Sequence, residues 1–423
     1  MWSVSSLQSV PPQHSTNSIA NKTLKRRRSS NSTTCRQLKV TLLAAEWGSK
    51  YRDMSTMNRE LAINLAKVQW CKNERVEVQV TFFVPNCSDR EKREAETFNV
   101  TIVEAKKYPG INMYGCLLCF PGDLTIDVVI GHDVMLGGQA QALKDQNKCK
   151  WVHVVHTDPK ELNGHTENKD VIELCENADL VMTVGPKLKE VCSNQLRGCG
   201  KEDNVFEFTP GIIEELFVQH ARRDSATFRV LLLGRTDPKD FKQKGYDVVV
   251  KAFKDELKGE NYCLVLVCAP SKRAGEVREY LKREFGIPEE LVEVKEFTES
   301  RKELQGLFRQ VELAIMPSRT AGFGLSALEA LSAGLPILVS NNSGLAHALR
   351  EIKFGDSCIV DSDDAKEWAK KIKAVRKKDR ETTRLPEIEL LRSSYKKKYS
   401  WQKQCTSFVE KIWDMVDGKK RLV

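Results

Sequence analysis

The sequence lacks an apolar run long enough to cross a membrane, so we expect no integral membrane segment and at most peripheral membrane contact. Residues 1–37 lack acidic side chains and the apolar segment of a secretory signal. Cys116 and Cys119 form a close cysteine pair, but no second pair follows at zinc-ribbon spacing, so we expect no metal site. These absences favour a globular protein, in line with 41% hydrophobic and 30% charged residues.

The length of 423 residues is too great for one ordinary core and predicts two domains with an additional tail. The formal net charge of +9 suits an acidic ligand, a phospholipid surface or simple solubility, of which we favour solubility. Thirteen cysteines are scattered, several of them in apolar runs such as Tyr262–Cys268, where cysteine acts as a small hydrophobic residue. This usage indicates a reducing compartment, and we predict a cytoplasmic location.

Residues 1–37 form a separate zone, rich in Ser, Thr and Asn, with the basic run Lys25–Ser30. Such a segment cannot bury enough apolar area to fold, and we predict a disordered, solvated tail. A mitochondrial presequence is an alternative that Pro11 and Pro12 disfavour, because they interrupt an amphipathic helix. A nuclear signal and phosphorylation of Ser29 or Ser30 also stay open.

Alternating strand and helix patterns begin at Lys39 and predict an α/β fold with parallel sheets covered on both faces. A second series begins after Pro210 and Gly211. We therefore predict two doubly wound, Rossmann-like domains facing each other across a cleft. The predicted bounds are 1–37 for the tail, 38–218 and 219–400 for the domains, and 401–423 for a C-terminal helix. The predicted strands are 39–45, 76–84, 127–133, 151–156 and 178–184, then 228–235, 263–268, 292–297, 313–316 and 337–340, with helices at 57–68 and 401–416.

The stretch Met316–Ser340 is the most informative part of the chain. It predicts a glycine-rich turn after an apolar strand, then a helix that opens near Gly324 and ends before Pro336. Free N–H groups and the positive end of the helix dipole favour an anion at such a helix start. The pattern therefore predicts a phosphate-binding turn.

This stretch resembles the donor-sugar loop of the large retaining glycosyltransferase family that includes sucrose synthase and bacterial mannosyl- and glucosaminyl-transferases, the family 4-like enzymes of GT-B architecture. Members carry Pro-Ser, then Glu-Gly-Phe-Gly-Leu, then Leu-Glu-Ala. Pro317-Ser318, Gly322-Phe323-Gly324-Leu325 and Leu328-Glu329-Ala330 match that pattern, whereas Ala321 occupies the place of the first glutamate. The resemblance covers residues 39–416 and implies that the last helix packs back on the first domain. The sequence alone suits a cap on the second domain equally well.

The resemblance also implies how the donor is bound. Gly322, Phe323, Gly324 and Leu325 would form the donor loop, and Glu329 would accept hydrogen bonds from the nucleotide ribose. Arg235 and Lys244, each next to a glycine, would hold the donor diphosphate, because two cations near a helix start neutralise a leaving pyrophosphate. The interval between them is longer than in most members, so Lys239 and Lys242 are alternatives for Lys244.

Three polar residues end apolar strands of the first domain and are the candidate catalytic residues: His132, Asp133 and His156. The resemblance implies that they contact the donor sugar and support cleavage of its anomeric bond. The first loop of that domain would contact phosphates and acceptor through Gly48, Arg52 and Ser55, although only one glycine of the family's usual pair is present.

We therefore predict a hexosyltransferase-type glycosyltransferase that moves a sugar from a UDP- or GDP-sugar to an unknown acceptor, with retention and without a metal or other cofactor. The alternative is a domain that binds a nucleotide or nucleotide sugar for recognition without turnover, which Ala321 favours. A third interpretation, nucleic-acid or membrane binding through the lysines of 366–398, is less favoured than a solvated helix face, and we expect no nucleic-acid partner.

Overall fold

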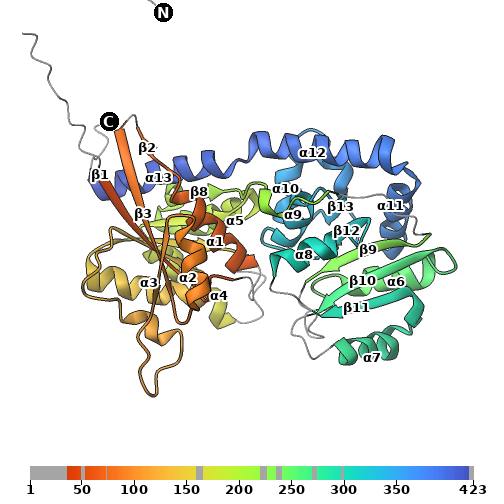
Figure 1. Ribbon diagram of the computed structural model, residues 1–423, viewed down its shortest axis with the longest axis horizontal. Coiled ribbons are helices and arrows are strands. Elements are labelled where there is room, and N and C mark those ends of the chain that lie inside the picture. The colour runs from red at the N-terminus through yellow and green to blue at the C-terminus, as the bar shows by residue number, and fades with distance from the viewer. Residues whose placement is uncertain are drawn as a thin grey trace, which may run out of the picture. The chain divides into compact units, whose positions relative to one another are not determined.

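The computed structural model describes residues 36–48, 53–72, 74–158, 165–219, 226–234, 241–268, 274–296 and 300–418, all in one compact unit. Figure 1 shows two mainly parallel sheets with helices packed around them. We call residues 36–219 the first half and residues 226–398 the second half.

The first half contains an eight-stranded sheet in which all neighbouring strands are parallel except β2 and β3. Val40 in its centre is opposite Val80 on one side and Val128 on the other. In spatial order the strands are β2 (Trp70–Cys71), β3 (Glu74–Val84), β1 (Arg36–Leu43), β5 (Val128–His132), β6 (Lys150–Val155), β7 (Leu180–Val184) and β8 (Val205–Phe208), and β4 (Val100–Glu104) pairs with β3.

The second half contains a six-stranded sheet that is parallel throughout. Its central strands are buried from end to end, as expected for a sheet with helices on both faces, which explains why they read as continuous apolar runs. In spatial order the strands are β11 (Val292–Glu296), β10 (Tyr262–Cys268), β9 (Phe228–Leu233), β12 (Leu313–Met316), β13 (Ile337–Ser340) and β14 (Ile359–Val360).

Helices connect the strands of both halves. In the first half they are α1 (Asp53–Leu65), α2 (Asp89–Glu96), α3 (Asp133–Asn147), α4 (His165–Asn177) and α5 (Pro186–Leu196), with short 3₁₀ turns at Gly115–Leu118 and Glu214–Leu216. In the second half they are α6 (Tyr246–Lys251), which continues as a π-helical turn at Ala252–Glu256, α7 (Ala274–Phe285), α8 (Arg301–Phe308), α9 (Leu325–Ser332), α10 (Gly344–Arg350), α11 (Ala365–Lys377) and α12 (Leu385–Lys398).

The last helix, α13 (Trp401–Asp417), packs against α1, β2 and β8, all of which belong to the first half. Phe408 contacts Phe206 with ring centroids 5.6 Å apart, and Trp401 contacts Phe208 at 5.6 Å. The ends of the described chain are also joined, because Arg36 forms an ion pair with Asp417. The first half therefore incorporates α13, the last helix of the described residues (Figure 1).

The two sheets confirm the predicted doubly wound α/β fold. Each strand predicted from an apolar run is present, with ends that shift by a few residues, as for β7, which begins at Leu180 instead of at 178. Four strands were not predicted. β2 and β14 have only two residues each, and β4 and β8 lie at or near sheet edges, where the apolar pattern is short.

Candidate active site

The three candidate catalytic residues lie together at the carboxyl ends of β5 and β6. The Nδ1 atom of His132 is 2.9 Å from the Nε2 atom of His156, so one of these nitrogens donates a hydrogen bond to the other. The Asp133 carboxylate accepts the backbone N–H of His156 at 2.9 Å. Asp133 has a φ of 42°, a left-handed conformation that is strained for a residue with a side chain. The structure thus joins the ends of two neighbouring strands through their polar residues.

Burial determines the charge of this cluster. His132 is completely buried, and burial lowers its pKa well below the usual value, with His156 and His153 adding to the shift. Burial raises the pKa of the Asp133 carboxyl, against the opposing effects of His156. Near neutral pH, His132 is therefore an uncharged hydrogen-bonding group.

A third histidine, His153, lies on β6 opposite Gly131, the residue before His132, and was not predicted to matter. It is fully buried in β6, its ring is 5.7 Å from that of Trp151, and neither ring nitrogen has a hydrogen-bond partner among the described residues. Burial lowers the pKa of His153 to about 3. Gly137 of α3 makes room for it, because a Cβ there would lie 2.7 Å from its Cε1 atom.

The glycine-rich turn after β12 packs directly on the end of β6. A Cβ at Gly322 would lie only 1.8 Å from the carbonyl oxygen of His156, so only glycine permits this approach. Phe323 is buried, with its ring against Gly185, the residue before α5. Gly324 has a φ of 100° and precedes the first residue of α9, Leu325. The predicted donor loop and the predicted catalytic histidines are thus in contact.

Ala321, which occupies the position of the missing glutamate, lies beside a lysine of the first half. The Lys187 ammonium donates to the carbonyl oxygens of Ala321 at 3.2 Å and Asn342 at 3.1 Å. The backbone of Ala321 also forms a parallel bridge with Ser343. The sequence contains no signal for this contact, because Lys187 and Ala321 are far apart in the chain.

Lys244 lies beside the same turn. Gly245 follows it at the start of α6 with a φ of 66°, and a Cβ there would lie 2.0 Å from the carbonyl oxygen of Pro317. At the end of β9, a Cβ at Gly234 would lie 1.8 Å from the hydroxyl oxygen of Tyr246. The chain before Arg235, the start of α6 and the turn after β12 therefore meet. Arg235 and the alternative Lys239 lie outside the described residues, whereas Lys242 is exposed.

Glu329 of α9 is buried, with 5% of its surface exposed, and does not point to solvent. Its Oε1 atom accepts the hydroxyl proton of Thr56, a residue of α1, at 3.1 Å. Ribose hydroxyl groups would have to reach a carboxylate that the first half already contacts. Thr56 was not predicted, and nothing in its sequence surroundings indicates the role.

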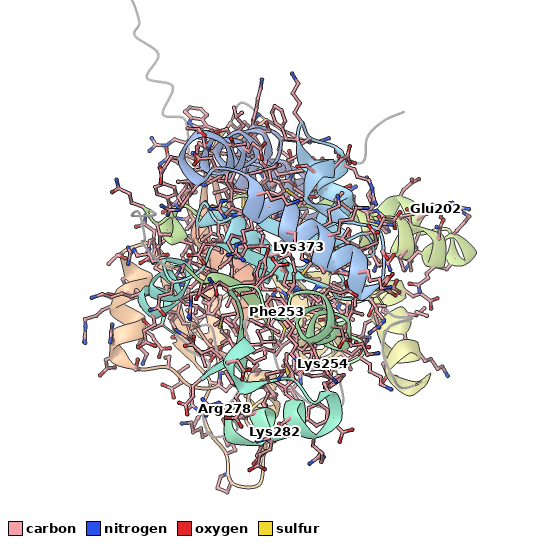
Figure 2. All side chains as sticks on the ribbon, turned by 90° about the vertical axis from the view of Figure 1, so that its right-hand side faces the viewer. Glu202, Phe253, Lys254, Arg278, Lys282 and Lys373 are labelled. Carbon is pink, nitrogen blue, oxygen red and sulfur yellow. The ribbon has the colours of Figure 1, made fainter. Side chains whose placement is uncertain are left out.

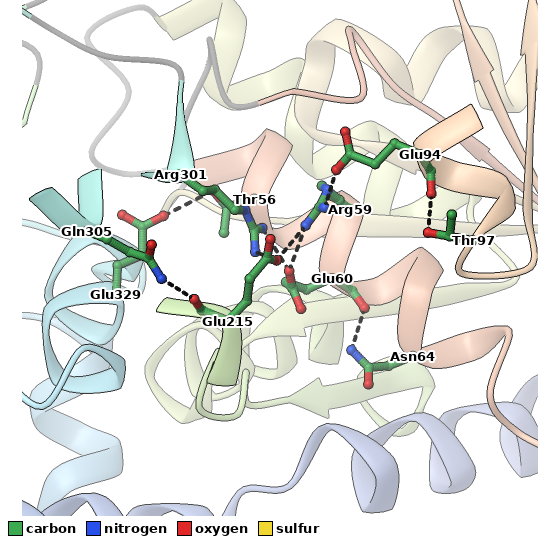
Figure 3. A network of polar contacts seen from close by, with 10 residues as sticks. All are labelled: Thr56, Arg59, Glu60, Asn64, Glu94, Thr97, Glu215, Arg301, Gln305 and Glu329. Carbon is green, nitrogen blue, oxygen red and sulfur yellow. Dashed lines mark hydrogen bonds and ion pairs between the residues drawn. The ribbon is translucent and has the colours of Figure 1, made fainter. Parts of the chain in front are cut away.

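An ion-pair network surrounds this contact and links the two halves (Figure 3). Arg301 of α8 contacts Glu60 of α1 at 2.7 Å and Glu215 at 2.6 Å. Arg59, whose side chain is 4% exposed, contacts Glu60 and Glu215 at 3.3 Å and Glu94 at 2.7 Å. Burial alone would lower the pKa of Arg301, but the carboxylates of Glu60 and Glu215 raise it above its usual value. The network holds α1, α8 and the 3₁₀ turn at Glu214–Leu216 in one arrangement.

The predicted acceptor and phosphate loop is only partly described. Gly48 is part of the described chain, and Arg52 lies outside it. Ser55 is buried and donates its hydroxyl proton to Glu46 at 3.1 Å, so in this structure it supports the loop from within. Within the described ranges, no group of three or more His, Cys, Asp and Glu side chains is arranged to hold a metal ion, and no helix is long and apolar enough to span a membrane.

Comparison with protein families matches residues 41–408 to "Family 4 Glycosyltransferase in conflict systems". The chain belongs to this family, which confirms the resemblance deduced from Met316–Ser340. Among curated proteins it is 26% identical over 277 residues to a D-inositol 3-phosphate glycosyltransferase of Corynebacterium jeikeium, and the alignment covers 59% of this chain and 64% of that enzyme. The corresponding enzyme of Corynebacterium urealyticum is 26% identical over 316 residues, covering 68% and 71%.

Solved structures give the same architecture. Sucrose-phosphate synthase from Thermosynechococcus elongatus superposes with a TM-score of 0.68 at 17% identity, covering 90% of this chain and all (100%) of that one. The Anabaena protein HepE, solved with UDP and glucose, superposes with a TM-score of 0.66 at 13% identity, covering 89% and 100%. At these identities the likeness establishes the fold.

Proposed function

We propose that the protein is a glycosyltransferase that transfers a sugar, with retention, from a nucleotide-diphosphate sugar to an acceptor. The observation that carries the proposal is the contact of Gly322 with the carbonyl of His156. It brings the glycine-rich turn and the start of α9 to the strand ends that bear His132 and His156. An anion-binding helix start next to the uncharged hydrogen-bonding group of His132 suits a diphosphate attached to a sugar.

The proposed roles follow from charge and position. Lys244 and Arg235 neutralise the donor diphosphate, which makes a metal ion or other cofactor unnecessary. His132 and His156 hydrogen-bond the sugar, because burial keeps His132 uncharged. Asp133 holds the backbone of His156 in place. Glu329 binds the ribose, and Gly48, Arg52 and Ser55 shape the acceptor side. Catalysis is then mainly positioning and electrostatic stabilisation.

A UDP-sugar is the donor we propose to test first, with GDP-sugars next. HepE was solved with UDP and glucose, and the similar corynebacterial proteins are named glycosyltransferases. A hexose is the sugar class that we propose. The acceptor side consists of first-half loops, and no substrate class for it follows from their residues.

A second candidate function is recognition of a nucleotide or nucleotide sugar without turnover. Ala321 favours it, because a methyl group cannot accept hydrogen bonds from sugar hydroxyls. The loss of a hydrogen bond to a charged group amounts to about 1.5–3 kcal/mol, or roughly tenfold to a hundredfold in rate when the bond forms in the transition state.

Release of free nucleotide from UDP-, GDP- and ADP-sugars by the purified full chain tests the proposal. We expect turnover of one donor and its loss in Glu329→Ala, with the fold of the variant checked by circular dichroism. Saturable nucleotide binding without turnover would instead establish the recognition function. Neither binding nor turnover with any donor would refute both.

We also propose a cytoplasmic location. The eleven cysteines whose side chains are described are all free thiols, as expected in a reducing compartment. Fractionation of cells that express the protein measures this directly, and a protein that reaches the culture medium would contradict it.

A further inference from the structure

The connection from β4 to β5, residues 105–127, is anchored to the core of the first half. Cys116 and Leu117 in its 3₁₀ turn are buried in the cluster that lines this half. The ring of Phe120 lies edge-on to Phe83 with centroids 5.2 Å apart, and the Gly115 N–H donates to the Asn112 side chain at 2.7 Å. These contacts fix the shape of the connection, so its other side chains are held where they are.

Apolar side chains of this anchored segment point to solvent. Tyr108, Ile111, Met113 and Leu118 are 38%, 47%, 42% and 38% exposed. Ten large hydrophobic side chains are exposed in the described residues, and these four of them lie within the short segment 108–118. Single exposed apolar residues are ordinary, but a cluster on a well-anchored loop indicates a surface that is covered during function. We call residues 106–118 the apolar loop.

The charged side chains within the apolar loop are both positive. Lys106 and Lys107 are exposed at its start, and residues 105–122 contain no acidic side chain. The Lys106 ammonium lies 5.5 Å from the ring centre of Tyr108, whereas Lys107 is 3.6 Å from Glu104 at the end of β4. Tyrosine and lysine side chains have an apolar stem and a polar tip. Together with exposed aliphatic side chains, they are the combination found at the interface of a bilayer.

We propose that the apolar loop docks this protein on a membrane surface that contains anionic lipids. Ile111 and Met113 enter the boundary between headgroups and acyl chains, and Lys106 and Lys107 contact anionic headgroups. The attachment is peripheral and reversible, because a few side chains bury little apolar area.

The lysine-rich region 366–398 does not offer an equivalent surface, because Leu390 is the single exposed large hydrophobic side chain in this described stretch and many of its cations are paired. Lys373 of α11, labelled in Figure 2, contacts Glu260 at 2.8 Å. Lys396 contacts Glu214 and Lys398 contacts Glu351, both at 2.6 Å. This contrast places the membrane contact on the first half.

The location of the apolar loop relates it to the candidate active site. It follows β4, and β4, β3, β1 and β5 are parallel, so the carboxyl end of β4 lies at the same edge of the sheet as His132 at the end of β5. A protein docked in this way presents that edge of its sheet to the bilayer. The docking itself does not depend on the proposed transferase activity.

Sedimentation of the full chain with vesicles tests the proposal. The vesicles consist of phosphatidylcholine alone or of phosphatidylcholine mixed with phosphatidylserine. We expect binding to the mixed vesicles, and a loss of about tenfold or more in affinity for the double variant Ile111→Ser, Met113→Ser. The matched control is Leu390→Ser, Val416→Ser, which removes two similarly exposed apolar side chains elsewhere and should bind as the unmodified chain does.

A charge variant, Lys106→Gln with Lys107→Gln, should reduce binding to the mixed vesicles and leave weak binding to neutral vesicles unchanged. Failure to bind mixed vesicles at low salt would overturn the proposal, as would equal binding by the Ile111, Met113 variant. A concentration-dependent dimer that this variant abolishes, without vesicle binding, would assign the apolar loop to a contact between two copies of the chain instead.

Discussion

The Thr56 hydroxyl donates to the Glu329 carboxylate at 3.1 Å, a contact between the first helix of one half and the helix that follows the glycine-rich turn of the other. If Glu329 binds ribose, this contact orients it. We expect Glu329→Ala to weaken UDP binding by about tenfold to a hundredfold, since it removes a charged acceptor, and Thr56→Val to weaken it by about threefold to tenfold.

Isothermal titration calorimetry with UDP measures these affinities. Thr56→Ser is the matched control, because it keeps the hydroxyl and should bind nearly as well as threonine. Unchanged affinity in Glu329→Ala would remove Glu329 from the nucleotide site, and Thr56→Ser behaving like Thr56→Val would show that the hydroxyl is not the group that matters.

Arg301 connects the two halves through Glu60 and Glu215. We expect Arg301→Ala to lower the free energy of unfolding by about 1–3 kcal/mol, because the buried Glu60 carboxylate loses its nearer cation and keeps only Arg59 at 3.3 Å, and because Glu215 is half-exposed. Urea denaturation measures the loss. Arg309→Ala, at the exposed end of the same helix, should change stability by less than about 0.5 kcal/mol. A similar loss in both variants would mean that the ion pairs contribute nothing specific.

Gly322 allows the glycine-rich turn to contact the end of β6. In Gly322→Ala the new methyl group would lie 1.8 Å from the His156 carbonyl, so the turn must move. We expect nucleotide affinity to fall by about tenfold or more, and stability by about 1–3 kcal/mol. Gly306→Ala in α8 is the control: nothing lies within 4 Å of its Cβ, and it should be neutral or slightly stabilising. Equal binding by the two variants would rule out a tight contact at Gly322.

His153 predicts an acid-sensitive stability. Its pKa is about 3 in the folded chain against 6.5 for an unperturbed histidine, so below about pH 6.5 the unfolded chain binds a proton that the folded chain does not. The free energy of unfolding is therefore unaffected by protonation of His153 above that pH. Below it, the free energy of unfolding falls by about 1.4 kcal/mol per pH unit down to about pH 3. Urea midpoints measured across this range should fall less steeply for His153→Leu. Parallel curves would show that His153 is protonated in the folded state.

Most of the fold could be predicted because parallel strands buried on both faces read as apolar runs, as in Leu313–Met316 and Ile337–Ser340. Helix ends were also visible where a glycine marks them, as at Gly324, whose φ of 100° favours glycine. The short strands β2, β4, β8 and β14 were not predicted, whereas the edge strand β11 was. A two-residue strand such as Ile359–Val360 has no pattern of its own and exists only because β13 offers free hydrogen-bonding groups beside it.

For the candidate site, the sequence indicated the residues on strand ends and in the turn, because position in a parallel sheet determines which of them meet. His132 and His156 were expected at the same edge and lie 2.9 Å apart. The sequence could not indicate the contacts of Thr56 with Glu329 or of Lys187 with Ala321. These residues are distant in the chain, so their contacts depend on how the two halves pack. Whether Arg235 joins the site stays a prediction.

The return of α13 to the first half determines the order in which the protein can be completed during synthesis. The ion pair of Arg36 with Asp417 joins the first described strand to the end of the last helix. Phe408 packs on Phe206, so the surface formed by β8 cannot be covered until the C-terminal segment has left the ribosome. The second half contains all of its own strands by Val360 and can form its sheet while the first half still waits for its last helix. A chain that ended near residue 400 would therefore lack the helix that covers β8 of the earlier-made half, and this surface would be exposed to chaperones.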